Sequence, residues 1–273
     1  MNGTPTVFDE IFRLLTPERL LLDPRATGEG VAVAMIDGGV ESSVLAAKHP
    51  QMHPIQGAIF RNDQPQPFPY LGHQSSPHGT TVADIILTMA PRVTLYSADV
   101  FGPTGTSEVD TVIRAIRHAI DVWNCKVINL SLGVPEAKLQ QPAKRAQLLR
   151  TVEEAYYRDV LVFAAAHNEH PLTRSYPAAF APPLISVDKG LFADPLDFAY
   201  ALRETVEFQA HGRAYLGPFT REPATSWATP HLSGIAARLL SLRPEMKPFE
   251  IKTLLYWMFV ARQSQESKAE TPG

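Results

Sequence analysis

Five short apolar runs recur along the 273-residue chain, and amphipathic stretches separate them. The runs are GVAVAMID (30–37), VTLYSADV (93–100), KVINLSLG (126–133), VLVFAAA (160–166) and PLISV (183–187). They are continuous rather than alternating, which indicates strands buried on both faces of a sheet. The pattern predicts an α/β fold, a three-layer sandwich in which helices cover both faces of a mostly parallel central sheet.

Between these runs, apolar residues recur at the spacing of three and four that lines one face of a helix. We expect helices over residues 78–89, 107–123, 144–159, 231–242 and 248–261. The stretch 51–77 is rich in Pro and Gln and has no clear period, so it predicts a surface loop.

The length and composition favour one large domain. With 273 residues, 45% of them hydrophobic, the chain can bury one substantial core. We expect a helical N-terminal extension over residues 1–28, the α/β domain over residues 29–262 and a disordered tail over residues 263–273.

Composition also excludes several partners. The formal charge of −3 comes without blocks of basic residues, so no nucleic-acid partner is expected. No stretch of about 18 apolar residues is present, so no membrane span is expected. The N-terminal residues lack the charge and apolar pattern of a signal peptide, and Cys125 is the only cysteine. We therefore expect a cytoplasmic protein in which Cys125 is a small core residue.

The stretch PATSWATPHLSG (223–234) combines a turn of small residues with a helical pattern. Proline is tolerated in the first turn of a helix, so Pro230 indicates that the helix begins close to Ser226. Unpartnered N–H groups at that helix end favour developing negative charge, which suits a serine nucleophile. Serine is also a common helix cap, so this segment alone leaves both interpretations open.

Four motifs together resemble those of the subtilisin-like serine proteases, the subtilases. They are VAVAMIDGG with Asp37, HGTTVADI with His78, AAAHNEH with Asn168 and PATSWATPH with Ser226. VINLSLG and SYPAAF are similar to the family's substrate-binding strand and to the segment that floors its specificity pocket. The resemblance covers about residues 29–242 with the motifs in the family's order, and it implies a subtilisin-like catalytic domain.

The resemblance implies a role for each of the four polar residues. Ser226 would be the nucleophile, His78 the base that takes its proton, and Asp37 the carboxylate that orients the imidazole. The Asn168 amide and the Ser226 backbone N–H would hold the oxyanion of the tetrahedral intermediate.

The resemblance also implies a peptide-binding groove. A substrate would lie as an added strand between Gly105–Ser107 and Ser131–Gly133. The implied substrate-binding residues are Gly105, Thr106, Ser107, Ser131, Leu132, Gly133, Ala165, Ala166, Glu169 and Ser175. The Glu169 carboxylate could favour a basic substrate side chain, whereas Ser175 would make the pocket shallower, and a solvated Glu169 without a substrate role is an equal alternative.

Every motif departs from the family pattern. The departures are Gly38, Thr81, Asp84, His167, Ala224 and Trp227. None of them removes an atom of the triad or of the oxyanion site, so we expect them to affect rate more than mechanism.

No cofactor or metal is expected. The pairs His49 with His53 and His167 with His170 suggest a metal site, but Pro50 and Pro54 argue against a helix that would bring the first pair together. The family's calcium loop is also not expected, because TMAP (88–91) leads almost directly to the next strand.

These observations predict a compact intracellular serine endopeptidase that acts on a peptide or protein through an acyl-enzyme. About 28 residues precede the first strand, too few for the family's folded propeptide, so we expect either that no maturation is needed or that a separate activating or inhibiting protein is a partner. Two alternatives stay open. One is a precursor-peptide maturation protease or macrocyclase, and the other is a pseudoprotease that binds peptides without cleaving them.

Overall fold

The structure is a computed structural model that describes residues 16–102, 105–169, 173–204 and 206–269. Within these residues, nine strands form one sheet in the order β10-β11-β9-β7-β5-β1-β4-β2-β3. They are β1 (Ala32–Asp37), β2 (Gln56–Ile59), β3 (Phe68–Pro69), β4 (Thr94–Asp99), β5 (Val127–Leu130), β7 (Leu161–Ala165), β9 (Ile185–Gly190), β10 (Phe198–Tyr200) and β11 (Phe208–His211). Neighbouring strands are parallel except in the edge pairs β2–β3 and β10–β11. A separate antiparallel pair joins β6 (Val134–Pro135) to β8 (Ser175–Tyr176).

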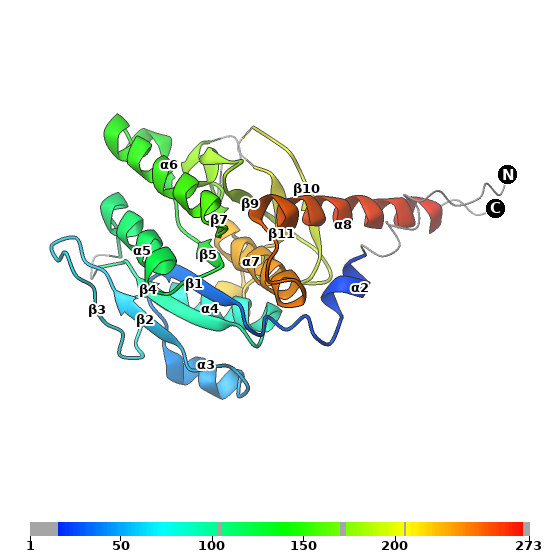
Figure 1. Ribbon diagram of the computed structural model, residues 1–273, viewed down its shortest axis with the longest axis horizontal. Coiled ribbons are helices and arrows are strands. Elements are labelled where there is room, and N and C mark those ends of the chain that lie inside the picture. The colour runs from blue at the N-terminus through cyan, green and yellow to red at the C-terminus, as the bar shows by residue number, and fades with distance from the viewer. Residues whose placement is uncertain (1–15, 103–104, 170–172, 205, 270–273) are drawn as a thin grey trace.

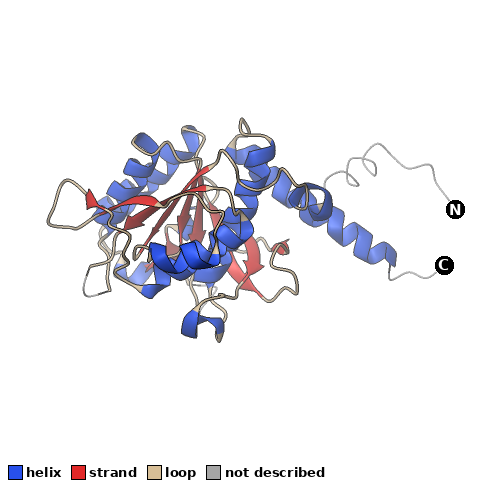
Figure 2. Cartoon of the chain, turned by 90° about the horizontal axis from the view of Figure 1, so that it is seen from below, coloured by secondary structure: helices blue, strands red, loops and turns tan. Residues whose placement is uncertain are grey.

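Helices cover both faces of this sheet (Figures 1 and 2). One face packs against α4 (Pro77–Met89), α7 (Thr225–Leu242) and α8 (Pro248–Ala269), and the other against α5 (Val109–Asp121) and α6 (Pro142–Tyr157). The shorter α3 (Ser42–Lys48) packs against α4, and α2 (Pro17–Leu21) against α7. The described residues also form three short 3₁₀ turns, η1 (Glu136–Lys138), η2 (Ala178–Phe180) and η3 (Gly217–Thr220).

The central strand β1 explains why its apolar run is continuous. Val33 and Met35 point into the core under α4 and α7, whereas Ala34 and Ile36 point into the core under α5. Alternate residues of a strand face opposite sides of a sheet, so both sets must be apolar when both faces are covered. The predicted three-layer α/β fold is confirmed.

Several local expectations were wrong. The predicted loop 51–77 contains β2 and β3, and the chain after the fifth apolar run adds β10 and β11. Helix α8 runs on to Ala269, where a disordered tail was expected from residue 263, because QSQESKA consists mostly of residues with good helix propensity. Figures 1 and 2 show this end of α8 extending away from the sheet. Of the predicted helical extension over residues 1–28, α2 is described, and residues 1–15 lie outside the described chain.

Candidate active site

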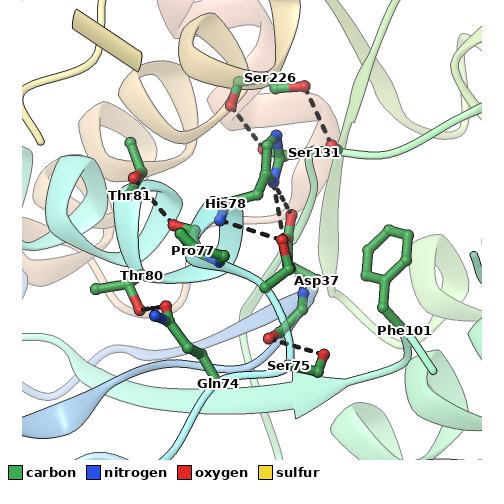
Figure 3. A network of polar contacts seen from close by, with 12 residues as sticks. Asp37, Gln74, Ser75, Pro77, His78, Thr80, Thr81, Phe101, Ser131 and Ser226 are labelled. Atoms are coloured by element: carbon green, nitrogen blue, oxygen red, sulfur yellow. Dashed lines mark hydrogen bonds and ion pairs between the residues drawn. The ribbon is translucent and has the colours of Figure 1, made fainter. Parts of the chain in front are cut away.

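Asp37 and His78 meet where the end of β1 faces the beginning of α4 (Figure 3). The Ser76 hydroxyl caps α4 by accepting the His78 N–H, and Pro77 occupies the first helical position, which places His78 in the first turn. The Asp37 side chain is fully buried, and both of its carboxylate oxygens lie 2.9 Å from His78 Nδ1. The carboxylate also accepts the Gly38 N–H at 2.7 Å. The imidazole is thereby held with Nδ1–H toward Asp37 and Nε2 free to accept a proton.

The environment of His78 raises its pKa above the ordinary imidazole value. Burial alone would lower the pKa, but the charge of Asp37 and its hydrogen bonds to Nδ1 together outweigh that effect. His78 is therefore more basic than a free imidazole, which strengthens it as a proton acceptor.

Ser226 lies in the first turn of α7. The N-cap residue Ala224 is extended, Thr225 is the first helical residue, and Ser226 follows it. Its hydroxyl donates to the Ser131 carbonyl oxygen at 3.3 Å. Figure 3 shows the imidazole of His78 lying between Ser226 and Asp37. The described hydrogen bonds of this region include none between Ser226 and His78, so the hydroxyl must turn away from Ser131 to give His78 its proton. Catalytic hydrogen bonds often form only when substrate binds.

Pro230 has a different place from the one expected. It is inside α7, in the second turn rather than the first. Its missing N–H leaves the carbonyl of Ser226, four residues earlier, without its helical partner. The Ser131 hydroxyl donates to this carbonyl at 2.9 Å. Pro230 therefore frees an acceptor that ties the nucleophile's turn to the end of β5.

Asn168, the predicted oxyanion donor, lies on the exposed segment that follows β7. Its side-chain Oδ1 accepts the Thr225 N–H at 3.1 Å. Asn168 and Ser226 line the same cavity, which has a volume of about 320 Å³. The structure thus brings the predicted amide donor and the predicted nucleophile to one cavity.

Most of the predicted substrate-binding residues line two adjoining cavities. The 320 Å³ cavity beside Ser226 is lined by Ser131, Leu132, Gly133, Ala165, Ala166, Glu169 and Ser175. The second, of about 390 Å³, is lined by Thr106, Ser107, Leu132 and Gly133, and also by apolar residues that include Phe101 and Tyr176. Leu132 and Gly133 line both cavities, so the two cavities adjoin at the segment that follows β5. Gly105 is described, but it lines neither cavity.

Ser76 leaves no room for a side chain at position 38, where the family has Thr or Ser and this chain has Gly38. A β-carbon at this position would lie 2.6 Å from Cβ of Ser76, well inside van der Waals contact. Ser76 thus fills the space of a family Thr or Ser. Nearby, Thr81 donates its hydroxyl to the Pro77 carbonyl within α4.

Asp84, where the family has glycine, is a fully buried carboxylate. Its two oxygens lie 2.7 Å from Lys48 Nζ and 2.7 Å from His49 Nε2, both at the end of α3. A buried carboxylate needs such partners, because removing its charge from water costs free energy that ion pairs and hydrogen bonds offset. Asp84 therefore fastens α3 to α4, the helix that carries His78.

Trp227 places an aromatic wall beside the base. It is 4% exposed, and its ring centroid lies 4.8 Å from that of His78 and 5.2 Å from that of Phe219. The buried His231 donates from Nδ1 to the Trp227 carbonyl at 2.7 Å and accepts the Tyr215 hydroxyl at Nε2 at 2.7 Å. Burial lowers the pKa of His231 to about 3, so this imidazole stays neutral and holds the turn beneath Trp227.

The other two departures from the family pattern, Ala224 and His167, alter the site less. Ala224 has φ −141° and ψ 154°, an extended conformation that a β-carbon does not strain. The half-buried His167 accepts the Glu169 N–H at Nδ1 at 3.3 Å. Glu169 is exposed at the rim of the cavity beside Ser226, and Ser175 is buried in its lining.

The histidine pairs considered for a metal have other partners or lie outside the described chain. His49 contacts Asp84 and His53 contacts Glu29, whereas His170 is not described. Among the described residues, no group of three or more His, Cys, Asp or Glu is placed to hold a metal ion. The connection from α4 to β4, residues 90–93, carries no carboxylate or amide side chain, so it does not fit the calcium loop of the family.

Two further observations bear on the rest of the chain. Cys125 is buried, and burial raises the pKa of its thiol, which disfavours the reactive thiolate. Across the described helices, none is long and apolar enough to cross a membrane.

Sequence reasoning missed two polar groups near Asn168. Lys189, on β9, donates from Nζ to the Asn168 carbonyl oxygen, and the Thr225 N–H contacts the Asn168 side chain. The sequence could have predicted the positive helix end at Thr225. No local sequence signal links Lys189 to Asn168, which lies 21 positions earlier.

The parallel sheet and the row of Asp37, His78 and Ser226 have the architecture of a subtilisin-like serine protease (Figure 3). The chain belongs to the Subtilase family, whose model matches residues 28–189 and 201–269.

Two curated relatives show the extent of the similarity. Subtilisin E of Bacillus subtilis (strain 168) is 31% identical over 255 residues, a match that covers 84% of this chain and 60% of that protein. Subtilisin of Bacillus pumilus is 31% identical over 247 residues, covering 84% and 83%. The chain therefore spans about 60% of the length of the first of these relatives.

Two solved structures share the fold. Sphericase superposes with a TM-score of 0.65 at 24% identity, over 86% of this chain and 86% of that chain. A structure titled as that of a lanthipeptide protease superposes with a TM-score of 0.64 at 20% identity, over 91% of this chain and 86% of that chain.

Proposed function

We propose that this chain is a serine endopeptidase that cleaves a peptide or protein substrate through an acyl-enzyme on Ser226. The observation that carries the proposal is the buried Asp37 carboxylate, 2.9 Å from His78 Nδ1, with Ser226 on the other side of the imidazole. This arrangement gives a base of raised pKa beside a hydroxyl at a positive helix end.

The reaction proceeds in two halves. Ser226 Oγ attacks the scissile carbonyl as its proton passes to His78 Nε2, and Asp37 stabilises the imidazolium without taking the proton. The oxyanion accepts hydrogen bonds from the Asn168 amide and the Ser226 N–H. His78 then protonates the leaving amine, and water hydrolyses the acyl-enzyme by the same steps in reverse order.

The groove supports a substrate that binds in extended form. The end of β5 and the segment through Thr106 and Ser107 border the larger cavity, whose apolar lining suits an apolar side chain. The exposed carboxylate of Glu169 at the rim of the smaller cavity favours Lys or Arg before the cut. Profiling a mixed peptide pool tests this preference, and a profile without enrichment of Lys or Arg rejects it.

The experiment that tests catalysis uses a fluorophosphonate probe, which reacts with activated serines. Wild type, Ser226→Ala and His78→Ala are treated, and the adduct is located by mass spectrometry. We expect labelling at Ser226 in wild type only. Unlabelled wild type that retains an intact peptide in a stoichiometric complex would instead support the peptide-binding pseudoprotease.

A second candidate is maturation of a precursor peptide, by cleavage or by macrocyclisation. It is favoured by the likeness to the structure titled as a lanthipeptide protease. An acyl-enzyme can be resolved by water or by an amine, so the masses of the products distinguish hydrolysis from ligation.

The setting of the enzyme is also a proposal. We place it in the cytoplasm, in keeping with a single, buried cysteine that makes no disulfide. We further propose a separate protein that restrains or activates it. Co-purification from the native cell, with and without the Ser226→Ala substitution, tests for this partner, and fractionation of the same cells tests the location.

A further inference from the structure

We propose that Lys189 is a positioning residue for the oxyanion site, because it holds the Asn168 amide in the orientation that stabilises the tetrahedral intermediate. This inference rests on the proposed function. Lys189 lies near the end of β9, and β9 pairs with β7 in the sheet. Asn168 follows the end of β7, so the two residues lie at the same edge of the sheet. Its ammonium group lies 2.7 Å from the Asn168 carbonyl oxygen and 3.3 Å from Asn168 Oδ1.

The contacts of Asn168 fix which end of its amide faces the cavity. The Lys189 ammonium and the Thr225 N–H can only donate hydrogen bonds, so both must face the amide oxygen rather than the amide nitrogen. The Nδ2–H groups therefore point away from Lys189 and Thr225. Since Asn168 lines the cavity beside Ser226, this orientation supplies N–H donors to an oxyanion formed there.

Asn168 needs such support because of its place in the fold. The residue is exposed and follows the end of β7, in contrast to the buried Asp37. Thr225 holds only the side chain, whereas Lys189 holds both the side chain and the backbone carbonyl. Catalytic donors must stay within fractions of an ångström of their working position, and a second contact to the backbone limits that motion.

The surrounding residues leave the Lys189 ammonium available for this role. The adjacent Asp188 carboxylate accepts the Lys189 backbone N–H and pairs with Arg203. No described salt bridge joins Lys189 to a carboxylate. A β-carbon at Gly212 would lie 2.8 Å from Lys189 Cβ, so glycine at that position makes room for the lysine stem.

The positive charge adds to the geometric effect. An ammonium at the oxygen end of an amide polarises its N–H groups and makes them stronger donors. Lys189 should therefore act on the chemical step more than on substrate binding.

The test is a double-mutant cycle on the full chain. Lys189→Met keeps the length of the stem and removes the donor, and Lys126→Met, at the start of β5 and at the far end of the sheet, is the matched control. Both substitutions are made in wild type and in Asn168→Ala. Hydrolysis of a peptide amide gives kcat and KM, and a peptide boronic acid, which forms a tetrahedral adduct with the serine, reports on the oxyanion site.

We expect Lys189→Met to lower kcat by about 5- to 50-fold, less than the loss of the amide itself, with KM within about twofold of wild type. Boronic acid affinity should fall in parallel with kcat. In the Asn168→Ala background the same substitution should change kcat by less than about twofold, because the group through which Lys189 acts is gone. Lys126→Met should leave all these values unchanged.

The outcomes separate this inference from the proposed function. If wild type hydrolyses no peptide and its Ser226 takes no fluorophosphonate, the proposed function fails and the role of Lys189 fails with it. If wild type is active and Lys189→Met keeps its kcat, or loses as much in Asn168→Ala as in wild type, only the role of Lys189 is overturned. Should the methionine variant fail to fold, Lys189→Arg and Lys189→Gln replace it. Arginine, which keeps the charge and the donors, should then retain more activity than glutamine, and equal activity overturns the inference.

Discussion

The two halves of the candidate site are held by different means. In the proton-transfer half, the fully buried Asp37 holds the partly exposed His78 where the end of β1 faces the first turn of α4. The oxyanion half depends on Asn168, which is exposed beyond the end of β7 and is held by contacts from β9 and from the start of α7.

This difference shows which residues could be substituted to alter each half of the site. The buried Asp37 carboxylate and the Ser76 cap at the start of α4 fix His78, so the polar contacts of the proton-transfer half come from Asp37 and from residues next to Asp37 and His78 in the sequence. Asn168 depends instead on Lys189 and Thr225, which lie far along the chain. Evolution or engineering can thus tune the oxyanion half through Lys189, which lies outside the motifs.

The largest effect expected from a conservative substitution is in the proton-transfer half. Asp37→Asn keeps the shape of the side chain and should lower kcat by about 10⁴-fold, a magnitude already known for serine proteases, because the imidazole loses its orienting charge. Hydrolysis of a peptide amide measures the loss, with the exposed Asp63→Asn as the control. A loss below about tenfold would contradict the assignment of Asp37.

The same variant should move the pH profile. His78 accepts a proton only when neutral, so kcat/KM of wild type should fall as pH drops through the His78 pKa, which lies above the ordinary value of about 6.5. Asp37→Asn removes the charge that raises this pKa, so the acid limb of the residual activity should shift to lower pH. An acid limb that stays in place would show that another group titrates.

A smaller effect is expected in the oxyanion half. Asn168→Ala should lower kcat by about 10²–10³-fold, the range already known for the equivalent asparagine of subtilisin, with little change in KM. The acid limb should stay where it is in wild type, because no contact of His78 is removed. The exposed Asn62→Ala is the control, and a shift of the acid limb in Asn168→Ala would mean that the two halves are not separable.

The sequence predicted the parts of the fold that depend on local patterns. The run around β1 is apolar at every position before Asp37 because both faces of the sheet are covered, and the apolar spacing over residues 78–89 placed His78 at a helix start. Edge strands carry weaker signals. Strand β2 is only four residues long and β3 only two, and each lies near the sheet edge, where polar residues and proline are tolerated.

The contacts that support the site could not be read from the motifs. Asp84 with Lys48, and Ser131 with Ser226, join residues brought together only by the packing of α3 on α4 and of α7 on β5. Pro230 shows the same limit. Proline indicated a helix start near Ser226, but its position in the second turn depends on the Ser131 hydroxyl that replaces the missing helical donor.

The smallest predicted effect concerns the helix turn that both halves share. Ser131→Ala removes the donor to the Ser226 carbonyl, and also the acceptor of the Asn129 side-chain amide, so it should lower the free energy of unfolding by about 1–3 kcal/mol. Pro230→Ala supplies an N–H to the same carbonyl. Chemical denaturation of the two single variants and the double variant measures their coupling. We expect Pro230→Ala to offset part of the loss in Ser131→Ala, because the new N–H satisfies the Ser226 carbonyl but not Asn129. Strict additivity would mean that the Ser226 carbonyl gains nothing from Ser131, and the turn that carries the nucleophile would then be held by α7 alone.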